Sequence, residues 1–373
     1  RCNTRTVIGG LNAEIPLVLE TPIYISGMSY GALSANAKIA LGKAASMIGS
    51  ASCTGDGGML QGERDASDKL VYQVLPSRYG FNPHHLVEAQ AVEIVVGQGA
   101  KPGTGGILMG IKVQGDVAEM RDLPQGIDQR SPARHPDWLG PDDLAVKIEQ
   151  IREATDWRVP VHVKLGACRV DDDVKLAAKA GADAIVIDSM VAGTGASAEV
   201  LIEHSGIPTV PAIVMAREAL RELGLYGKVS LIASGGIRHG ADAAKALALG
   251  ADAVAIGIGA LIALNCNKEI PESNFAKEIG VEAGYCHHCH TGKCPVGIAT
   301  QDPLLTRRLD PDEGAERVAN YINSMTMEMT LLTRSLGKSD VHSLEPEDLA
   351  ALTLEASAMA KIPLVGTNKV FGE

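Results

Sequence analysis

The sequence predicts an α/β protein, a (β/α)₈ barrel of the TIM type, from three observations. Short and almost continuously apolar runs alternate with helical stretches, which is typical of parallel strands covered on both faces. Two successive strand–helix units end their strands in glycines, at 234–236 and 257–259. The composition, 41 Gly and 3% aromatic residues in 373, suits the many tight turns of such a fold.

The elements follow in order along the chain. Strands are expected at residues 22–26, 92–96, 161–165, 184–188, 208–214, 229–233 and 253–256. Helices are expected at residues 35–47, 144–154, 172–180, 216–223 and 241–249. Residues 56–140 fit a bare barrel less well, because long loops rich in Gly, Pro and Asp interrupt them, and such loops in compact domains are often functional.

Four parts are predicted. They are an N-terminal extension (1–21), the barrel (22–265), a Cys-rich loop (266–302) and a C-terminal helical appendage (303–373). Within the appendage, residues 311–361 predict two or three helices, one of them starting at 344–349 with Pro and acidic residues in its first turn. The chain starts at Arg1 rather than Met, so we expect further residues before it.

Charge and hydropathy exclude several classes of protein. With 34 Lys and Arg against 45 Asp and Glu, the net charge is −11, and no dense basic stripe points to nucleic acid. No apolar run reaches the roughly 18 residues of a membrane span, and no signal peptide is visible. We therefore expect a cytoplasmic protein that binds neither nucleic acid nor membrane.

Four of the seven cysteines cluster near the end of the predicted barrel: Cys266, Cys286, Cys289 and Cys294. The last three have the spacing Cys-x₂-Cys-x₄-Cys, which lets one loop present three thiolates, and Pro295 follows as is common at iron–sulfur sites. Adjacent histidines leave a zinc site open, and unligated thiols are the third interpretation. A disulfide framework is not expected from this odd, clustered set.

Glycine-rich turns are the second group of candidates. Gly235 with Gly236, and Gly257 with Gly259, predict a phosphate cradle, because any Cβ would keep backbone N–H groups from the phosphate oxygens. Plain tight turns are the alternative. The turn around Met28 is suited to wrapping a flat cofactor, and residues 193–197 offer another backbone cradle.

Charged and nucleophilic side chains are the third group. Lys164 lies in an apolar strand, where it must be paired or its pKa falls, so it is either a site residue or a structural ion-pair partner. Arg78 and Lys101 together suit a dicarboxylate, with solvated charges as the alternative. Two cysteines and three histidines are interpreted as structural, the cysteines as buried: Cys53, Cys168, His135, His162 and His204.

Taken together, the motifs resemble the FMN-binding domain of glutamate synthases. The matching segments are SGMSYGALS (26–34), TGDGG (54–58), QGAKPG (98–103), VKL (163–165), GTGAS (193–197), SGG (234–236) and CHTGKCPVGIATQ (289–301). They are long, stand in the family's order and extend from about residue 22 to 302.

This resemblance implies an FMN-containing barrel with an iron–sulfur cluster beside the flavin. It implies 2-iminoglutarate chemistry, with reductive amination of 2-oxoglutarate by hydride from reduced FMN. The residues implied to hold FMN are Met28, Ser29, Gln98, Lys164, Gly193, Gly195, Gly235, Gly236, Gly257 and Gly259. The residues implied around the substrate are Asp56, Arg78, Lys101 and Lys112, of which Asp56 and Arg78, with Lys164, are implied in catalysis.

The sequence departs from the family pattern at three places. Asp56 stands where the family usually has Glu, and the loop 166–170 is short where the family carries a segment linked to ammonia delivery. The usual first cluster cysteine is replaced by Ala283, so the third ligand is Cys266 or Cys286. Three ligands imply a 3Fe–4S cluster, which we favour, and four a 4Fe–4S cluster.

The stand-alone organisation resembles the FMN subunit of the N-methylglutamate synthase branch (methylamine–glutamate N-methyltransferase), as do residues 123–130 and 134–138. That implies methylamine in place of ammonia and separate amidotransferase-like and β-helix-like subunits in a hetero-oligomer. The alternatives are a glutamate synthase subunit that aminates 2-oxoglutarate and a non-catalytic, zinc-binding scaffold subunit.

Overall fold

The computed structural model describes residues 2–99, 101–193, 197–269 and 275–372. Eight parallel strands form one sheet in the order β3, β12, β11, β10, β9, β6, β5, β4. Their bounds are β3 Ile23–Ile25, β4 Ser52–Cys53, β5 Leu70–Val74, β6 Ala91–Val95, β9 Val161–Gly166, β10 Ala184–Asp188, β11 Ser230–Ser234 and β12 Ala253–Ile256. Ile25 N donates to Ala51 O at 3.0 Å, so the sheet closes into the predicted barrel.

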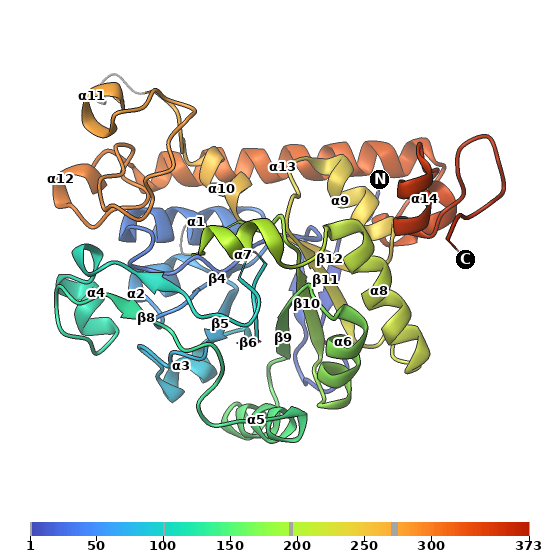
Figure 1. Cartoon of the computed structure of the whole chain (residues 1–373), viewed down its shortest axis with the longest axis horizontal. Helices are drawn as coiled ribbons and strands as arrows, with labels where there is room; N and C mark the ends of the chain where they lie inside the picture. The colour runs from blue at the N-terminus through green and yellow to red at the C-terminus, as the bar shows by residue number, and fades with distance from the viewer. Residues whose placement is uncertain (1, 100, 194–196, 270–274, 373) are drawn as a thin grey trace.

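Helices cover the outside of the barrel (Figure 1). Those that follow successive strands are α1 Ala35–Met47, α2 Gln61–Ala66, α3 Pro83–Glu88, α5 Pro141–Ala154, α6 Val170–Lys179, α8 Thr209–Glu222 and α9 Gly240–Ala248. Smaller elements lie in the loops: β7 Ile107–Leu108, η1 Gly110–Lys112, α4 Gly115–Met120, β8 Gln129–Arg130, α7 Glu199–His204, α10 Ile258–Ala263, α11 Phe275–Ile279 and α12 Pro303–Thr306. Most of these excursions follow the carboxyl ends of strands, where barrel sites form.

An N-terminal hairpin packs at the opposite end of the barrel. Strands β1 (Thr6–Ile8) and β2 (Leu17–Leu19) pair antiparallel and share one apolar cluster with barrel residues such as Val71 and Ile232. Asn12 Nδ2 donates to Asp183 at 2.8 Å, just before β10 begins. The amino-terminal end of the barrel is thereby covered, which leaves the carboxyl end for chemistry.

The long helix α13 (Pro311–Ser335) lies between α1 and α9, as Figure 1 shows along the top of the molecule. This is the place of the eighth helix of a (β/α)₈ barrel, because α10 after β12 is only six residues long. Asp310 caps the helix, and Ile322 and Met329 are fully buried in it. The chain then ends in η2 Val341–Ser343, η3 Pro346–Asp348 and α14 Leu354–Ala360.

Most predicted elements are confirmed. Helix 35–47 is right at both ends, and its start is fixed by Ser34, which accepts a hydrogen bond from Ala37 N. The strand predicted at 208–214 is wrong: these residues begin α8, where two prolines fit the N-terminus and the buried apolar positions continue at helical spacing. The helix that we expected to start at 344–349 is only a single 3₁₀ turn. Strands β4 and β5 were not predicted.

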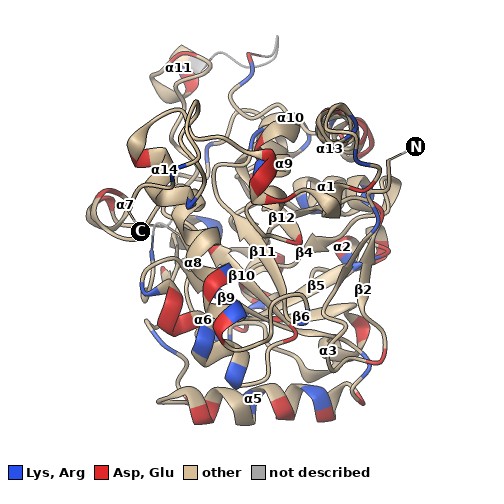
Figure 2. Cartoon of the chain, turned by 90° about the vertical axis from the view of Figure 1, so that its right-hand side faces the viewer, with Lys and Arg blue, Asp and Glu red and all other residues tan. Residues whose placement is uncertain are grey.

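Charges are interspersed on the surface. In Figure 2, acidic and basic residues both lie along α5, whereas in α6 the acidic residues fill the first turn and the lysines follow. Within the described ranges, none of the helices has both the length and the apolar character needed to cross a bilayer.

Candidate functional site

A polar arc lies inside the barrel near the carboxyl ends of four adjacent strands. It consists of Gln73 on β5, Glu93 on β6, Lys164 on β9 and Asp188 on β10, each at most 4% exposed. Gln73 Nε2 donates to Glu93 Oε1 at 2.6 Å, and Lys164 Nζ lies 3.2 Å from Asp188 Oδ2. Polar residues in consecutive strands of an otherwise apolar barrel indicate a site rather than packing.

Lys164 is held as a cation by this arc. Burial lowers the pKa of its ammonium, but Asp188, and after it Glu93, more than offset the burial, so the pKa lies above its ordinary value. The expected pairing of a strand lysine is therefore present. Glu93 was not predicted, although a charged residue within the apolar strand expected at 92–96 is the same kind of signal that pointed to Lys164.

Two acceptor atoms of the arc lack a hydrogen-bond donor among the described residues. Gln73 Oε1 and Asp188 Oδ1 are buried, and within the described ranges neither has a hydrogen-bond partner. A Cβ on Gly27, in the turn after β3, would stand 2.6 Å from Gln73 Oε1, so the turn's backbone lies against this amide. A flat ring system with N–H donors at its edge fits such a place.

The turns that start at β4 and β5 carry the predicted substrate residues. Asp56 accepts hydrogen bonds from Ser77 Oγ at 2.7 Å and from Ser131 Oγ at 3.0 Å. Arg78, with a φ of 56°, pairs with Asp137 at 2.7 Å. Both side chains are thus fixed by their neighbours at the barrel mouth.

Lys101 joins these residues electrostatically. Burial lowers the pKa of its ammonium, and Asp56 opposes that effect while Lys164 adds to it. The charge of Lys101 is therefore coupled both to Asp56 and to Lys164 and Asp188 of the polar arc. Among the predicted substrate residues, Asp56, Arg78 and Lys101 occupy this one mouth.

Lys112 is placed differently from the other predicted substrate residues. Its ammonium donates to Ala32 O at 2.6 Å and to Cys289 O at 3.0 Å, between the turn after β3 and the Cys-rich segment. Burial lowers its pKa to about 8, although Cys289 and Cys294 oppose this. Its contacts join the two segments rather than facing Asp56.

Several supporting residues were not predicted from the sequence. Arg121, 2% exposed, donates to Gln129 Oε1, to Tyr30 O at 2.5 Å and to Asp56 O at 3.2 Å. A Cβ on Gly57 would stand 2.5 Å from its guanidinium carbon, so the turn carrying Asp56 packs directly on Arg121. No local pattern signals such an arginine, because its partners lie far away along the chain.

The predicted phosphate turns follow β11 and β12. Gly235 and Gly236 have φ of 108° and 75°, which favour glycine, and a Cβ on Gly257 would meet no atom of the described residues within 4 Å. A Cβ on Gly259 would stand 2.6 Å from the hydroxyl of Tyr321, so α13 touches this turn. The open space over Gly257 fits a phosphate group.

The other predicted flavin residues lie around the same mouth. Met28 and Ser29 are half-buried in the turn after β3, and Gln98 pairs with Lys101 in an isolated bridge after β6. Gly193 is exposed and faces Ile258 of α10, because its Cβ would lie 3.8 Å from Ile258 Cδ1. Gly195 lies outside the described residues.

The four clustered cysteines influence one another electrostatically. Burial raises the pKa of Cys266 to about 12, and the neighbouring thiols of Cys289, Cys294 and Cys286 raise it further in that order. In the described part of the chain, no three His, Cys, Asp or Glu side chains are arranged so that they could hold a metal ion. The donor set fits an iron–sulfur cluster in chemistry, because thiolates are the ligands of such clusters and both Cys266 and Cys289 are coupled to the other thiols of the set.

The remaining cysteines and histidines divide by exposure. Cys53 is buried, as expected, and burial raises its pKa. The expectation of a buried Cys168 is wrong: it is exposed in the short loop after β9. His135 and His162 are buried, whereas His204 is exposed on α7.

Comparison with known proteins gives one consistent family. The family described as the conserved region in glutamate synthase matches residues 3–339. A glutamate synthase large subunit-like protein of Rhizobium meliloti is 55% identical over 99% of this chain and 83% of its own length. An archaeal glutamate synthase (NADPH) of Methanocaldococcus jannaschii is 44% identical over 88% of this chain, which covers 61% of that relative.

Solved structures support the fold alone. The flavin-binding domain of baker's yeast flavocytochrome b2 gives a TM-score of 0.56 at 16% identity, covering 93% of this chain and 72% of that one. The Pediococcus acidilactici lactate oxidase gives a TM-score of 0.52 at 17% identity, and the match covers 92% of this chain and 81% of the oxidase.

Proposed function

The chain belongs to the glutamate synthase family, and on that premise we propose that it is the FMN- and iron–sulfur-containing catalytic subunit of an N-methylglutamate synthase. In this reaction glutamate and methylamine give N-methylglutamate and ammonia through 2-iminoglutarate. The chain spans about three fifths of the archaeal relative, so the activity of the assembled enzyme belongs to this proposal.

One observation carries the choice of amine. The segments that resemble the methylamine branch, 123–130 and 134–138, supply direct contacts to the two predicted catalytic residues of the mouth. Gln129 lies 3.5 Å from the Asp56 carboxylate, and His135 Nδ1 lies 2.8 Å from a guanidinium nitrogen of Arg78. If the methylamine branch differs from other family members in its amine or amino-acid substrate, we expect the segments specific to that branch to position the residues that contact the substrate.

FMN fits the carboxyl end of the barrel. Its phosphate would lie on the turns of Gly235, Gly236, Gly257 and Gly259, and its ring would contact Met28, Ser29, Gln98 and Lys164, with Gly193 and Gly195 beside it. Gln73 Oε1 and Asp188 Oδ1, which have no partner among the described residues, would be acceptors for ring N–H groups. The chemistry that FMN supplies when bound is reversible hydride transfer at the α-carbon.

The chain's own residues bind and orient the amino acid. Arg78 and Lys101 suit its two carboxylates, since paired cations match a dicarboxylate. The carboxylate of Asp56, fixed by two serine hydroxyls, is available to hold the protonated amine. Lys164 places a fixed positive charge beside the electron-rich part of the ring system.

The reaction balances without an outside reductant. Glutamate loses a hydride from the α-carbon and a proton from nitrogen, giving 2-iminoglutarate. Methylamine adds to the C=N bond and ammonia leaves, which gives the N-methylimine. The hydride then returns to the α-carbon and a proton to nitrogen, which gives N-methylglutamate. The cycle therefore needs no net electrons from an iron–sulfur cluster.

Isotopic labelling of the complete complex tests this proposal. The assembled enzyme is incubated with α-¹⁵N-glutamate and unlabelled methylamine without reductant, and products are followed by mass spectrometry. We expect unlabelled N-methylglutamate together with ¹⁵N-ammonium. No N-methylglutamate from the assembled complex, under conditions where it retains flavin, would refute the methylamine assignment.

A second candidate is supported by the names of the relatives, several of which are glutamate synthase (NADPH). In that case the chain is part of an enzyme that aminates 2-oxoglutarate with electrons from NAD(P)H or ferredoxin. Glutamate formed only with 2-oxoglutarate, ammonia and an electron donor would support it. Protein containing zinc and no flavin would favour the scaffold alternative instead.

A further inference from the structure

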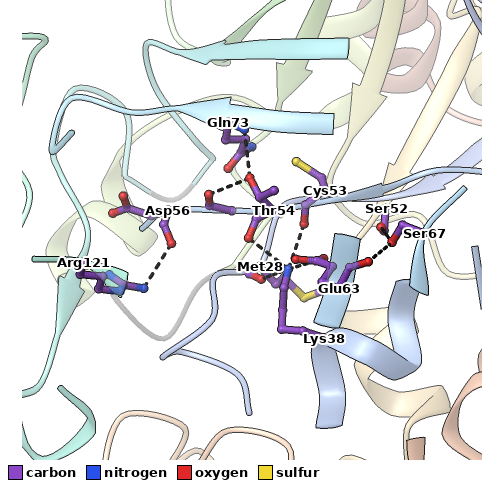
Figure 3. A network of polar contacts seen from close by, with 11 residues as sticks. Met28, Lys38, Ser52, Cys53, Thr54, Asp56, Glu63, Ser67, Gln73 and Arg121 are labelled. Carbon is purple, nitrogen blue, oxygen red and sulfur yellow. Dashed lines mark hydrogen bonds and ion pairs between the residues drawn. The ribbon is translucent and has the colours of Figure 1, made fainter. Parts of the chain in front are cut away.

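A buried ion pair lies directly behind the barrel mouth. Lys38 in α1 and Glu63 in α2 are each 1% exposed, and their charged atoms are 2.7 Å apart (Figure 3). Taking two charges out of water costs more free energy than their attraction usually returns. The pair therefore calls for a role beyond simple stabilisation.

The ammonium of Lys38 also contacts backbone. It donates to Met28 O at 2.6 Å, and to Cys53 O and Thr54 O at 3.0 Å each. These carbonyls belong to the turn after β3, to the last residue of β4 and to the turn after β4, and these two strands are the two ends of the sheet order. One cation thus ties together the two turns that meet where the barrel closes.

The two turns touch at one glycine. Gly55 has a φ of 74°, and a Cβ there would overlap the backbone nitrogen of Ser29 and lie 2.6 Å from the carbonyl carbon of Met28. Asp56 follows immediately. Any movement of this junction therefore displaces Met28, Ser29 and Asp56 together.

We propose that Lys38, held by Glu63, is a positioning residue of the active site, which locks the flavin-facing turn of Met28–Ser29 against the substrate-facing turn of Thr54–Asp56. The inference rests on the proposed function, because that function makes these turns cofactor and substrate contacts. Glu63 keeps the ammonium in place: without a carboxylate behind it, the cation would be buried against carbonyl dipoles alone.

A purely structural role predicts a different outcome. Replacing a buried ion pair by apolar residues of similar size often restores stability, but it cannot restore hydrogen bonds to three carbonyls. The double variant Lys38→Met with Glu63→Leu therefore separates stability from positioning. Lys43→Met is the matched control, since Lys43 lies on the same helix, is exposed and pairs only with Asp312 among the described contacts.

The test measures FMN affinity of the full chain freed of flavin, by quenching of FMN fluorescence, together with thermal unfolding. We expect the Kd for FMN to rise at least about tenfold in Lys38→Met and in the double variant. The unfolding temperature of the double variant should be closer to that of the parent protein than the unfolding temperature of Lys38→Met is. Lys43→Met should bind FMN as the parent does.

Two results would overturn the inference: parental FMN affinity in the double variant, or parental affinity in a folded Lys38→Met. If Lys38→Met does not fold, the double variant decides, and Glu63→Gln, which retains an acceptor, should weaken FMN binding less than either. A parent protein that binds no FMN refutes the proposed function instead. An enzyme that binds FMN but rejects methylamine leaves the Lys38 inference intact.

Discussion

Lys164 balances two buried carboxylates, Asp188 and Glu93, inside the barrel. Within the described residues, the arc they form with Gln73 combines one cation, two acids and two acceptors without partners. A site of this kind is pre-organised, because its charges are fixed by the strands before any ligand arrives. It also makes each member costly to remove.

The variant Lys164→Met should lose most FMN binding and about 3–5 kcal/mol of stability, because it leaves Asp188 buried without its cation. Adding Asp188→Asn should recover part of the stability but not the FMN affinity. Urea unfolding and flavin content check both expectations. Lys175→Met, at a partly exposed lysine of α6 that pairs with Asp171 and Glu222 on the outside of the barrel, is the control, and parental flavin content in Lys164→Met would contradict the assigned role.

His162 gives the barrel a predictable pH dependence. Burial lowers its pKa from 6.5 to about 4, and within the described ranges neither ring nitrogen has a hydrogen-bond partner. A histidine with a lowered folded pKa contributes stability that is present above pH 6.5 and lost as pH falls toward about 4. His135, with the same direction of shift, adds to the loss.

In the parent protein, His162 should lower the free energy of unfolding by up to about 1.4 kcal/mol for each pH unit below 6.5. We expect His162→Leu to lose this part of the pH dependence. Urea unfolding of parent and variant at about pH 7.5, 6 and 5 measures the difference. Identical slopes in the two proteins would mean that His162 is not held neutral.

At the scale of elements, a helix was predictable where its own sequence carries the signal. Helix α1 has a serine cap and a continuous small apolar face, so both ends were right. Strand β4 has two residues and cannot be recognised from periodicity, and the apolar start of α8 resembles a strand until its charged residues appear.

The candidate site was predictable in its motifs but not in its supports. Turns such as the one carrying Asp56 have glycines at fixed spacing, which a sequence displays. Lys38 and Arg121 are long charged residues on helices or at their ends, and such residues are usually solvated. Their burial depends on partners from distant segments, which only the fold brings together.

The junction of the turns after β3 and β4 yields a prediction with a close control. Gly55→Ala introduces a Cβ that overlaps Ser29, so it should weaken FMN binding about tenfold or more. Gly224→Ala has a similar φ of 66° but no atom within 4 Å of the added carbon. It should cost only the backbone strain, about 1–2 kcal/mol, and keep FMN affinity.

Flavin titration and urea unfolding of both glycine variants separate the two effects. Equal FMN affinity in Gly55→Ala and Gly224→Ala would show that the contact between the turns does not shape the flavin site.

At the scale of the whole molecule, the Cys-rich segment lies between the barrel and the helix that completes it. The chain leaves the short α10, passes Cys266, forms the segment of Cys286–Cys294 and only then enters α13. Lys112 donates to Cys289 O and Ala32 O, which joins this segment to the turn after β3. A cluster held by these cysteines would lie next to the turn that we propose faces the flavin.

The contacts of Asn267 favour a four-cysteine set. Its side chain accepts from Cys286 N at 2.9 Å and donates to Cys286 O at 3.3 Å, which brings Cys286 beside Cys266, the residue before it. We therefore expect Cys266→Ser and Cys286→Ser each to lose most of the bound iron, as Cys289→Ser and Cys294→Ser should. Elemental analysis and the visible spectrum of anaerobically purified protein measure this, with the exposed Cys168→Ser as control. Full iron in either Cys266→Ser or Cys286→Ser would leave three ligands and a three-iron cluster, whereas zinc in place of iron would overturn the redox assignment of the segment.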